Sequence, residues 1–303
     1  MPPLSILVTG ASGTVGTELV PALAAAGHGV TLLVRRPPRP GSAEIQWDPT
    51  GAPNAALFEG SDAVIHLAGE SIASSNWTED KKARILNSRV QGTATLAASL
   101  ARMAKPPRVV IAASAIGYYG NRGDELLVEE STSGTGFLAE VCRQWEAALA
   151  PAVKAGIRVV NLRLGMVLSA RGGALKKMLT PFKLGAGGRL GSGRQWISWI
   201  SIADVVGAIQ FILANDALRG PVNAVSPQPV SNAEFTRALG RALHRPTLFP
   251  MPAFLVRLVF GQLGEELLLA SQKVEPARLQ AAGFPYRHSE IGACLRELLR
   301  SDV

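Results

Sequence analysis

The chain has 303 residues, 47% hydrophobic and 18% charged, which suits a globular protein with one large α/β domain and a smaller lobe. We find no apolar run near the ~18 residues of a membrane span, no secretory leader and no ligand-like cysteine cluster. We therefore expect a cytoplasmic protein with no membrane partner and no metal site. The net charge is +8, but without a basic tract or aromatic ladder we expect no nucleic-acid partner.

The first expected strand, Leu4–Val8, and the turn after it are the most informative segment. Gly10, Gly13 and Gly16 follow at intervals of three, and a helical pattern runs over Thr14–Ala26. The first glycine permits a tight turn, the second lets backbone N–H groups approach a pyrophosphate, and the third lets the helix pack closely on the strand. The helix N-terminus also favours negative charge. The segment therefore predicts a dinucleotide-binding turn.

The second expected strand, Val30–Val34, ends at Arg35 and Arg36. A site for NAD(H) places a carboxylate here to bind the ribose 2′-hydroxyl. A guanidinium can instead bind a 2′-phosphate through two hydrogen bonds. We therefore expect NADP(H) as the cofactor. The alternative is that the two arginines form a solvated basic turn.

Three further apolar runs, each followed by a helical pattern or a turn, continue the alternation of strands and helices. Thr78 is a candidate N-cap for one long helix, and a second helical pattern begins at Phe137 and stops at Gly156. Near-continuous apolar runs are typical of strands buried on both faces of a parallel sheet. The alternation predicts a Rossmann-type, doubly wound α/β fold. The three runs are Ala63–Ala68, Val109–Ala113 and Val159–Leu162.

Beyond Gly165 the pattern loosens. Residues Ser169–Arg194 are rich in glycine, with six basic side chains and no acidic one. Two interpretations stand level: the segment clamps an acidic substrate, or it is a mobile surface loop. Trp196–Ile202 predicts a returning strand, and the chain is mostly helical from Asn232 onward. We expect a Rossmann domain over residues 1–165 and 196–225, and a substrate-side lobe over residues 166–195 and 226–303.

Several segments resemble the extended short-chain dehydrogenase/reductases. These are the glycine turn, Asp62–Gly69 and the strand end at Ser114. Others are similar to an atypical subgroup, the epimerase family proteins, and the resemblance covers essentially the whole chain. It implies a Rossmann-type sheet with a smaller, mostly helical C-terminal substrate lobe, including a subgroup-specific segment over about 249–300. The subgroup segments are Gly69–Ile72, Asn87–Arg89, Gly117–Gly120, Phe137–Glu146, Gly191–Gly193 and Phe249–Phe284.

The resemblance also implies a cofactor site. The glycine turn would cradle the pyrophosphate, the two arginines after the second strand would meet the 2′-phosphate, and the end of the third strand would line the adenosine. Two side chains further on would face the cofactor cleft, and one residue after the fifth strand would flank the nicotinamide. The resemblance assigns Gly10, Gly13, Thr14, Val15 and Gly16 to the pyrophosphate, and Arg35 and Arg36 to the 2′-phosphate. It assigns Leu67, Ala68 and Gly69 to the adenosine, Glu70 and Arg89 to the cofactor cleft, and Val167 to the nicotinamide.

One departure from the superfamily concerns catalysis. Working reductases carry Tyr-x-x-x-Lys on the helix after the fourth strand, where the lysine lowers the pKa of the tyrosine. Here the pair becomes Phe137/Val141 or Leu138/Cys142, depending on the alignment. Neither pair can transfer a proton as the tyrosine does.

Three polar side chains near the end of the fourth strand are candidates for the missing role: Ser114, Tyr118 and Tyr119. The serine matches the superfamily's catalytic Ser/Thr position and could hydrogen-bond a substrate carbonyl. The alternative is that the serine caps the strand and the tyrosines wall the cleft. Glu129 and Glu130, in a loop, are expected on the solvated surface.

Two functional hypotheses follow. In the first, the protein is an NADP(H)-dependent oxidoreductase, or resembles a nucleotide-sugar epimerase, and acts on an unidentified small molecule. In the second, it is a non-catalytic NADP(H)-sensing protein that binds a partner, which the missing tyrosine and lysine favour, with a link to cell division. A homodimer is compatible with either hypothesis.

Overall fold

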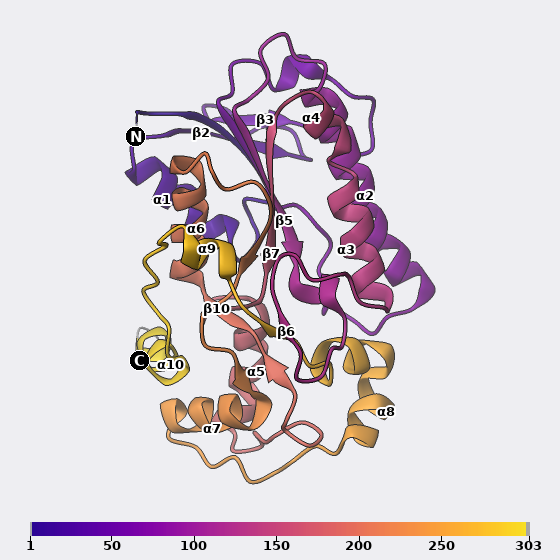
Figure 1. The fold of residues 1–303 in the computed structure, drawn as a ribbon, viewed down its shortest axis with the longest axis vertical. Helices are drawn as coiled ribbons and strands as arrows, with labels where there is room; N and C mark the ends of the chain where they lie inside the picture. The colour runs from indigo at the N-terminus through magenta and orange to yellow at the C-terminus, as the bar shows by residue number, and fades with distance from the viewer. Residues whose placement is uncertain (1, 301–303) are drawn as a thin grey trace.

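The computed structural model describes residues 2–300, which are built around one seven-stranded sheet (Figure 1). Every neighbouring pair of strands is parallel, in the order β11-β7-β5-β4-β1-β2-β3. The order reverses between β1 and β4, which is where parallel sheets of this type bind ligands. In chain order the strands are β1 (Ser5–Thr9), β2 (Gly29–Val34), β3 (Glu44–Gln46), β4 (Ala63–His66), β5 (Val109–Ala115), β7 (Arg158–Leu164) and β11 (Gly220–Ala224).

Helices cover both faces of the sheet (Figure 1). On one face α1 (Gly16–Ala25) and α6 (Ile202–Ala214) pack together over a core of aliphatic side chains. On the other, α2 (Glu79–Leu100) contacts both α3 (Phe137–Ala147) and α4 (Ala150–Lys154). This arrangement confirms the predicted Rossmann-type, doubly wound sheet, because the apolar strands are buried from both sides.

A smaller, mostly helical part lies beyond the carboxyl ends of the strands. Three helices share a second core there: α5 (Gly173–Lys183), α7 (Asn232–Leu243) and α10 (Ile291–Arg300). The remaining elements of the chain are α8 (Ala253–Leu263), a π-helical turn (Gly264–Leu268), α9 (Ala277–Ala281), two 3₁₀ turns (Ala55–Leu57 and Ile116–Tyr119) and the short strands β6 (Leu126–Leu127), β8 (Met166–Leu168), β9 (Trp196–Ile197), β10 (Trp199–Ser201), β12 (Val230–Ser231) and β13 (Lys273–Val274).

The structure narrows one alternative for this part and corrects one expectation. Helix α5 forms inside the glycine-rich segment and buries Leu175, Leu179 and Phe182 at helical spacing, so a surface loop describes only the rest of that segment. The expected strand over Trp196–Ile202 is broken into β9 and β10, which pair with different strands, β12 and β8. Tertiary pairing, rather than the apolar run itself, decides where these strands begin and end.

Within residues 2–300, none of the helices combines the length and apolar character that crossing a bilayer requires. The same residues hold no group of three or more His, Cys, Asp or Glu side chains arranged to bind a metal ion.

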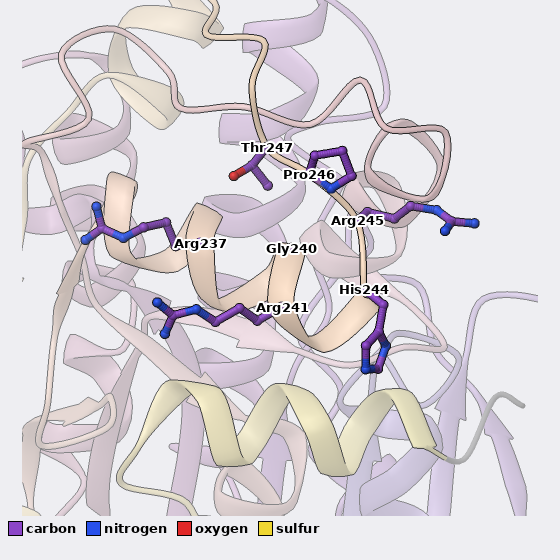
Figure 2. A pocket seen from close by; sticks show the side chains of 7 residues that line it. All are labelled: Arg237, Gly240, Arg241, His244, Arg245, Pro246 and Thr247. Carbon is purple, nitrogen blue, oxygen red and sulfur yellow. The ribbon is translucent and has the colours of Figure 1, made fainter.

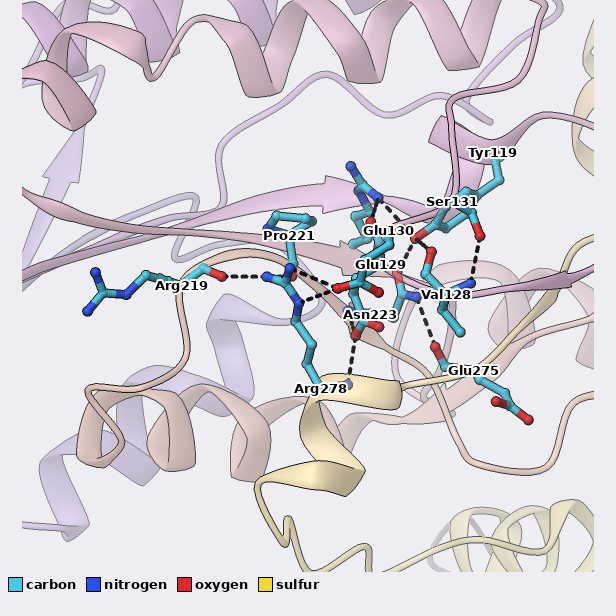
Figure 3. Close-up of polar contacts among 11 residues, drawn as sticks. Tyr119, Val128, Glu129, Glu130, Ser131, Arg219, Pro221, Asn223, Glu275 and Arg278 are labelled. Carbon is cyan, nitrogen blue, oxygen red and sulfur yellow. Dashed lines mark hydrogen bonds and ion pairs between the residues drawn. The ribbon is translucent and has the colours of Figure 1, made fainter.

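A polar network joins α9 to the edge strand β11 (Figure 3). Glu129 lies at its centre and is only 3% exposed, so the expectation of a solvated side chain was wrong for this residue. Its Oε1 accepts hydrogen bonds from the backbone N–H groups of Asn223 and Arg278, at 3.0 and 3.3 Å. Its Oε2 is buried without a partner among the described residues, and burial raises the pKa of the carboxyl. Glu130 instead pairs with the Arg278 guanidinium at 3.0 Å.

The raised pKa of Glu129 predicts how the free energy of unfolding depends on pH. The folded state holds the proton more tightly than the unfolded state, so the ionised form destabilises the fold increasingly as the pH rises above the usual carboxyl range. We expect Glu129→Gln, which keeps the Oε1 acceptor, to increase the free energy of unfolding near pH 8 by about 1 kcal/mol. The gain should shrink towards pH 4, as measured by urea unfolding at several pH values.

Glu130→Gln is the matched control, because Arg278 holds the pKa of the Glu130 carboxyl below its usual range. It should lose a small stabilisation that is present at neutral pH and disappears as the pH falls. A loss of stability in Glu129→Gln that is the same at every pH would contradict the assignment.

Candidate functional site

The glycine turn brings three backbone segments into contact. Gly10 has φ +70°, and a Cβ there would lie 2.6 Å from the Leu67 carbonyl carbon. A Cβ on Gly16 would lie 2.5 Å from the Gly10 oxygen. Only glycine fits at these two positions. The N-cap of α1 is Val15, which provides no side-chain cap, so the helix N-terminus leaves N–H groups for an anion.

A hollow of about 160 Å³ lies directly over this turn. Ser12, Gly13 and Thr14 line one side of it, and the segment from Ser169 to Gly172 lines the other. The two sides are close, since a Cβ on Gly172 would lie 2.6 Å from Thr14 Oγ1. The hollow is thus a partly open space beside an uncapped helix N-terminus, which suits a phosphate group, and Glu18 at its border is paired with Arg171.

Two neighbours of the hollow connect it to the helical lobe. Arg171 pairs with Glu18 of α1, with 3.1 Å between Nη1 and Oε1. Val167 lies on β8, two residues before Ser169, and packs partly buried against the core beneath the turn. The first arginine of the basic, glycine-rich segment, Arg171, therefore lies beside the glycine turn.

The two arginines after β2 have different surroundings. Arg36 forms a two-pronged pair with Glu44 of β3, at 2.6 and 2.9 Å. The hydrogen bond from Arg36 and another from the Arg39 N–H lower the pKa of the Glu44 carboxyl to about 2. Arg35 is exposed, and no carboxylate of residues 2–300 forms an ion pair with it. At neutral pH the charge of Arg36 is therefore largely compensated, whereas Arg35 has no close ion pair among the described residues and acts on the Glu70 carboxylate only as a weaker, more distant charge.

The loop after β4 is held by hydrogen bonds to its backbone. Thr9 Oγ1 accepts from the N–H groups of Leu67 and Ala68, at 3.1 and 3.3 Å. Arg89 of α2 donates to the Glu70 carbonyl oxygen at 3.0 Å, and a Cβ on Gly69 would lie 3.2 Å from the guanidinium carbon. These contacts set the course of residues 67–70 beside the glycine turn.

Side chains reinforce the same loop. The Glu70 carboxylate turns away towards Lys81, which is 2% exposed and donates to it at 2.6 Å. The Lys81 hydrogen bond lowers the pKa of the Glu70 carboxyl. The Arg89 guanidinium lies 5.0 Å from the Trp145 ring centre, and burial lowers its pKa. A half-buried guanidinium thus lies beside the loop after β4, between that loop and Trp145 of α3.

Ser114, at the end of β5, belongs to a buried ion-pair network. Its Oγ donates to Glu146 Oε1 of α3 at 2.7 Å. Arg163 of β7, 3% exposed, binds both oxygens of the same carboxylate at 2.8 Å. The Arg163 guanidinium carbon also lies 3.5 Å from the ring centre of the half-buried Tyr118. One guanidinium therefore orients both the serine's acceptor and the tyrosine ring.

Tyr119 faces the opposite way from the cleft. It is fully buried, and its hydroxyl lies 2.8 Å from Asn223 Oδ1 while accepting from Arg163 Nη1 at 3.0 Å. Burial raises the pKa of this hydroxyl. The placement does not support the predicted catalytic role for Tyr119, which acts as an internal bridge between strands.

The positions of the absent tyrosine and lysine are taken by apolar contacts. A Cβ on Gly117 would lie 3.3 Å from Leu138 Cβ and 3.9 Å from Cys142 Sγ, so this pair faces the end of β5. Burial raises the pKa of the Cys142 thiol to about 11. Phe137 instead packs edge-on against Trp77, with ring centres 5.1 Å apart. The helix therefore presents no group that titrates near neutral pH at these positions.

Residues 6–224 match the NAD dependent epimerase/dehydratase family, and residues 251–298 match a domain of unknown function, DUF1731. The chain belongs to this epimerase family. The Epimerase family protein Mb2239 of Mycobacterium bovis is 44% identical over 291 residues, which cover 96% of each chain. The human Epimerase family protein SDR39U1 is 36% identical, over 98% of this chain and 100% of its own.

Two solved structures of relatives share the fold. That of human SDR39U1 (isoform 2) with NADPH has a TM-score of 0.89 at 36% identity, and the match covers 98% of this chain and 99% of that one. A nucleoside-diphosphate sugar epimerase from Corynebacterium glutamicum has a TM-score of 0.82 at 41% identity. The match covers 98% of this chain but spans only 58% of the length of that one.

Several polar residues of this epimerase-family site escaped the sequence reasoning. Glu44, Glu146 and Arg163 act through partners on other strands or helices, and Arg171 reaches the turn from the lobe. One local signal was available, because Arg163 stands between two leucines in the strand β7, and a charge in a buried strand needs a partner. The partner itself could not be identified from spacing.

The network around Ser114 predicts a hierarchy of stability effects. Glu146→Ala would leave Arg163 buried without its carboxylate and should lower the free energy of unfolding by about 3–5 kcal/mol. Ser114→Ala removes one hydrogen bond and leaves the ion pair intact, so it should cost about 1 kcal/mol. Urea unfolding of the two variants measures both values. Equal effects would show that the ion pair contributes no more than the hydroxyl.

Proposed function

We propose that the protein binds NADP(H) at the glycine turn and uses it to oxidise, reduce or epimerise a small molecule. The observation that carries the proposal is the uncapped N-terminus of α1, with Gly10 and Gly16 in close backbone contact and a hollow over Gly13 and Thr14. Such a hollow fits the pyrophosphate of a dinucleotide. The structure of the human relative with NADPH supports the same assignment.

Each predicted cofactor residue has a part in this binding mode. The backbone of residues 13–16 would hold the pyrophosphate, and Arg35 would bind the 2′-phosphate because its charge is less compensated than that of Arg36. Arg36 would contribute less, because its guanidinium is already paired with the Glu44 carboxylate. Residues 67–70 would line the adenosine with their backbone, Arg89 would face the cofactor from below the loop, and Val167 would flank the nicotinamide.

Ser114 and Tyr118 would handle the substrate. NADP(H), when bound, supplies or accepts a hydride. Ser114 Oγ directs its proton to Glu146, so on its free side it can only accept a hydrogen bond. We therefore expect it to hold a substrate hydroxyl, and to polarise a carbonyl only after turning from Glu146. Tyr118, with its ring against Arg163, would be the donor.

A second candidate function is a non-catalytic NADP(H) sensor that binds a partner. The placement of Leu138 and Cys142 favours it, because the usual proton donor and its lysine are replaced by groups that do not titrate near neutral pH. The two candidates share the cofactor site and differ only in whether Ser114 and Tyr118 support turnover.

The two arginines give the sharpest test of cofactor choice. Arg35→Asp should weaken NADPH binding by roughly ten- to a hundredfold, because a charged hydrogen-bonded partner of the 2′-phosphate is lost. NADH binding should change little. Arg36→Asp is the matched control and should have a smaller effect, since Glu44 already compensates that charge. Titration calorimetry with NADPH and with NADH measures the affinity of each variant for both nucleotides. Equal weakening for both nucleotides, or no heat with either, would overturn the assignment.

Turnover separates the enzyme from the sensor. With NADPH and a panel of small carbonyl compounds and nucleotide sugars, we expect Tyr118→Phe to lower kcat by roughly a hundredfold and to leave NADPH affinity unchanged. Tyr119→Phe should affect stability rather than kcat. If NADPH binds but no compound turns over, partner capture from extracts with and without NADPH tests the sensor. Identical captured sets would count against that candidate as well.

A further inference from the structure

The positive charge of the protein is concentrated in one part of the fold. Residues 169–195 and 226–258 hold ten of the 31 Lys and Arg residues and one of the 23 Asp and Glu residues. The rest of the chain therefore has 21 basic and 22 acidic side chains. The net charge of +8 thus arises in this basic region, which comprises α5, α7, the start of α8 and the segments that join them.

The basic region forms the end of the molecule opposite β2 and β3, and the segment between α7 and α8 runs along its outer edge (Figure 1). Arg237 and Arg241 extend from α7 towards the same side, and both belong to the lining of an open hollow of about 490 Å³ (Figure 2). Arg245 donates from Nε to the Lys183 carbonyl oxygen at 2.9 Å. None of these arginines forms an ion pair with a carboxylate of residues 2–300.

Large apolar side chains are exposed along the same edge. Leu184 is 79% exposed, Leu248 75% and Phe249 66%. Their segments lie side by side, because the Met251 N–H donates to the Arg189 carbonyl at 2.9 Å and residues 183 and 245 are hydrogen-bonded. Further along the chain, Phe254 and Leu258 lie one turn apart on α8 and are 65% and 78% exposed. Exposed clusters of this kind mark interaction sites.

We propose that this end of the protein docks on the surface of an anionic lipid bilayer. Leu184, Leu248 and Phe249 would enter the boundary between headgroups and acyl chains, and the surrounding Lys and Arg side chains would meet lipid phosphates. Such docking needs no spanning helix, so it is compatible with the helices described above. It departs from the expectation of no membrane partner, which considered spans and leaders alone.

Charge and shape favour a bilayer over the other possible occupants. A second copy would set two positive surfaces against each other. A nucleic acid would match the charge but would leave the exposed leucines and phenylalanine in water. An anionic bilayer matches both the positive charge and the exposed apolar side chains, since it offers phosphates over a wide area and an apolar layer a few ångströms below them.

Flotation with lipid vesicles tests the proposal on the full chain. With phosphatidylcholine–phosphatidylglycerol vesicles at low salt we expect the protein to float, and with phosphatidylcholine alone to stay in solution. Binding should weaken as added NaCl shortens the Debye length from ~30 to ~8 Å. The double variant Leu248→Ser/Phe249→Ser should bind at least about tenfold more weakly. Arg237→Glu/Arg241→Glu should lose a similar factor.

The matched control is Val153→Ser/Lys154→Glu on α4, which removes one exposed apolar and one basic side chain in a different part of the molecule. It should bind vesicles like the unmodified protein, and thermal unfolding shows whether each variant is folded. Failure of the unmodified protein to float at low salt, or equal losses in all variants, would overturn the proposal. So would binding to duplex DNA without vesicle binding, or a dimer in sedimentation that Leu248→Ser/Phe249→Ser abolishes.

Discussion

Close backbone contact at the glycine turn is the constraint on which the rest of the site depends. Gly10 touches the chain just after β4, and Gly16 touches Gly10, so β1, α1 and the β4 loop are fixed relative to one another within a few ångströms. Thr9 Oγ1 locks the same arrangement through the N–H groups of Leu67 and Ala68. The hollow beside the uncapped N-terminus of α1 and the course of the loop after β4 follow from this one meeting point.

A second constraint acts at the other end of the cleft, and it is electrostatic. Arg163 and Glu146 lie on different elements and are both largely buried, so each needs the other to offset the loss of water. Ser114 and Tyr118 are oriented by that pair rather than by their own backbone. The glycine turn is therefore shaped by close backbone contacts, and the surroundings of Ser114 and Tyr118 by a buried ion pair.

This difference explains what could be predicted. The alternation of strands and helices that builds most of the sheet, and the glycine turn, are local patterns of apolar runs and spacing, and both were predicted; β3 was not. The pairing of Arg36 with Glu44 was missed because β3 has three residues and a single apolar side chain. Burial of Glu129 was missed because its partners, Asn223 and Arg278, are far away along the chain. The helix α5 was hidden by flanking glycines and Pro181.

The same reasoning bears on the absent tyrosine and lysine. A proton donor on a helix is visible as a motif because its two residues lie one turn apart, whereas a donor positioned by a strand-to-helix ion pair leaves no fixed spacing. In this chain the helix positions are filled by Leu138 and Cys142, and the polar groups stand across the cleft on β5, β7 and the turn after β5. Loss of the motif therefore says little about loss of chemistry. Chemistry at this site depends on whether a substrate binds to Ser114 and Tyr118 on the side that faces away from the Glu146–Arg163 pair.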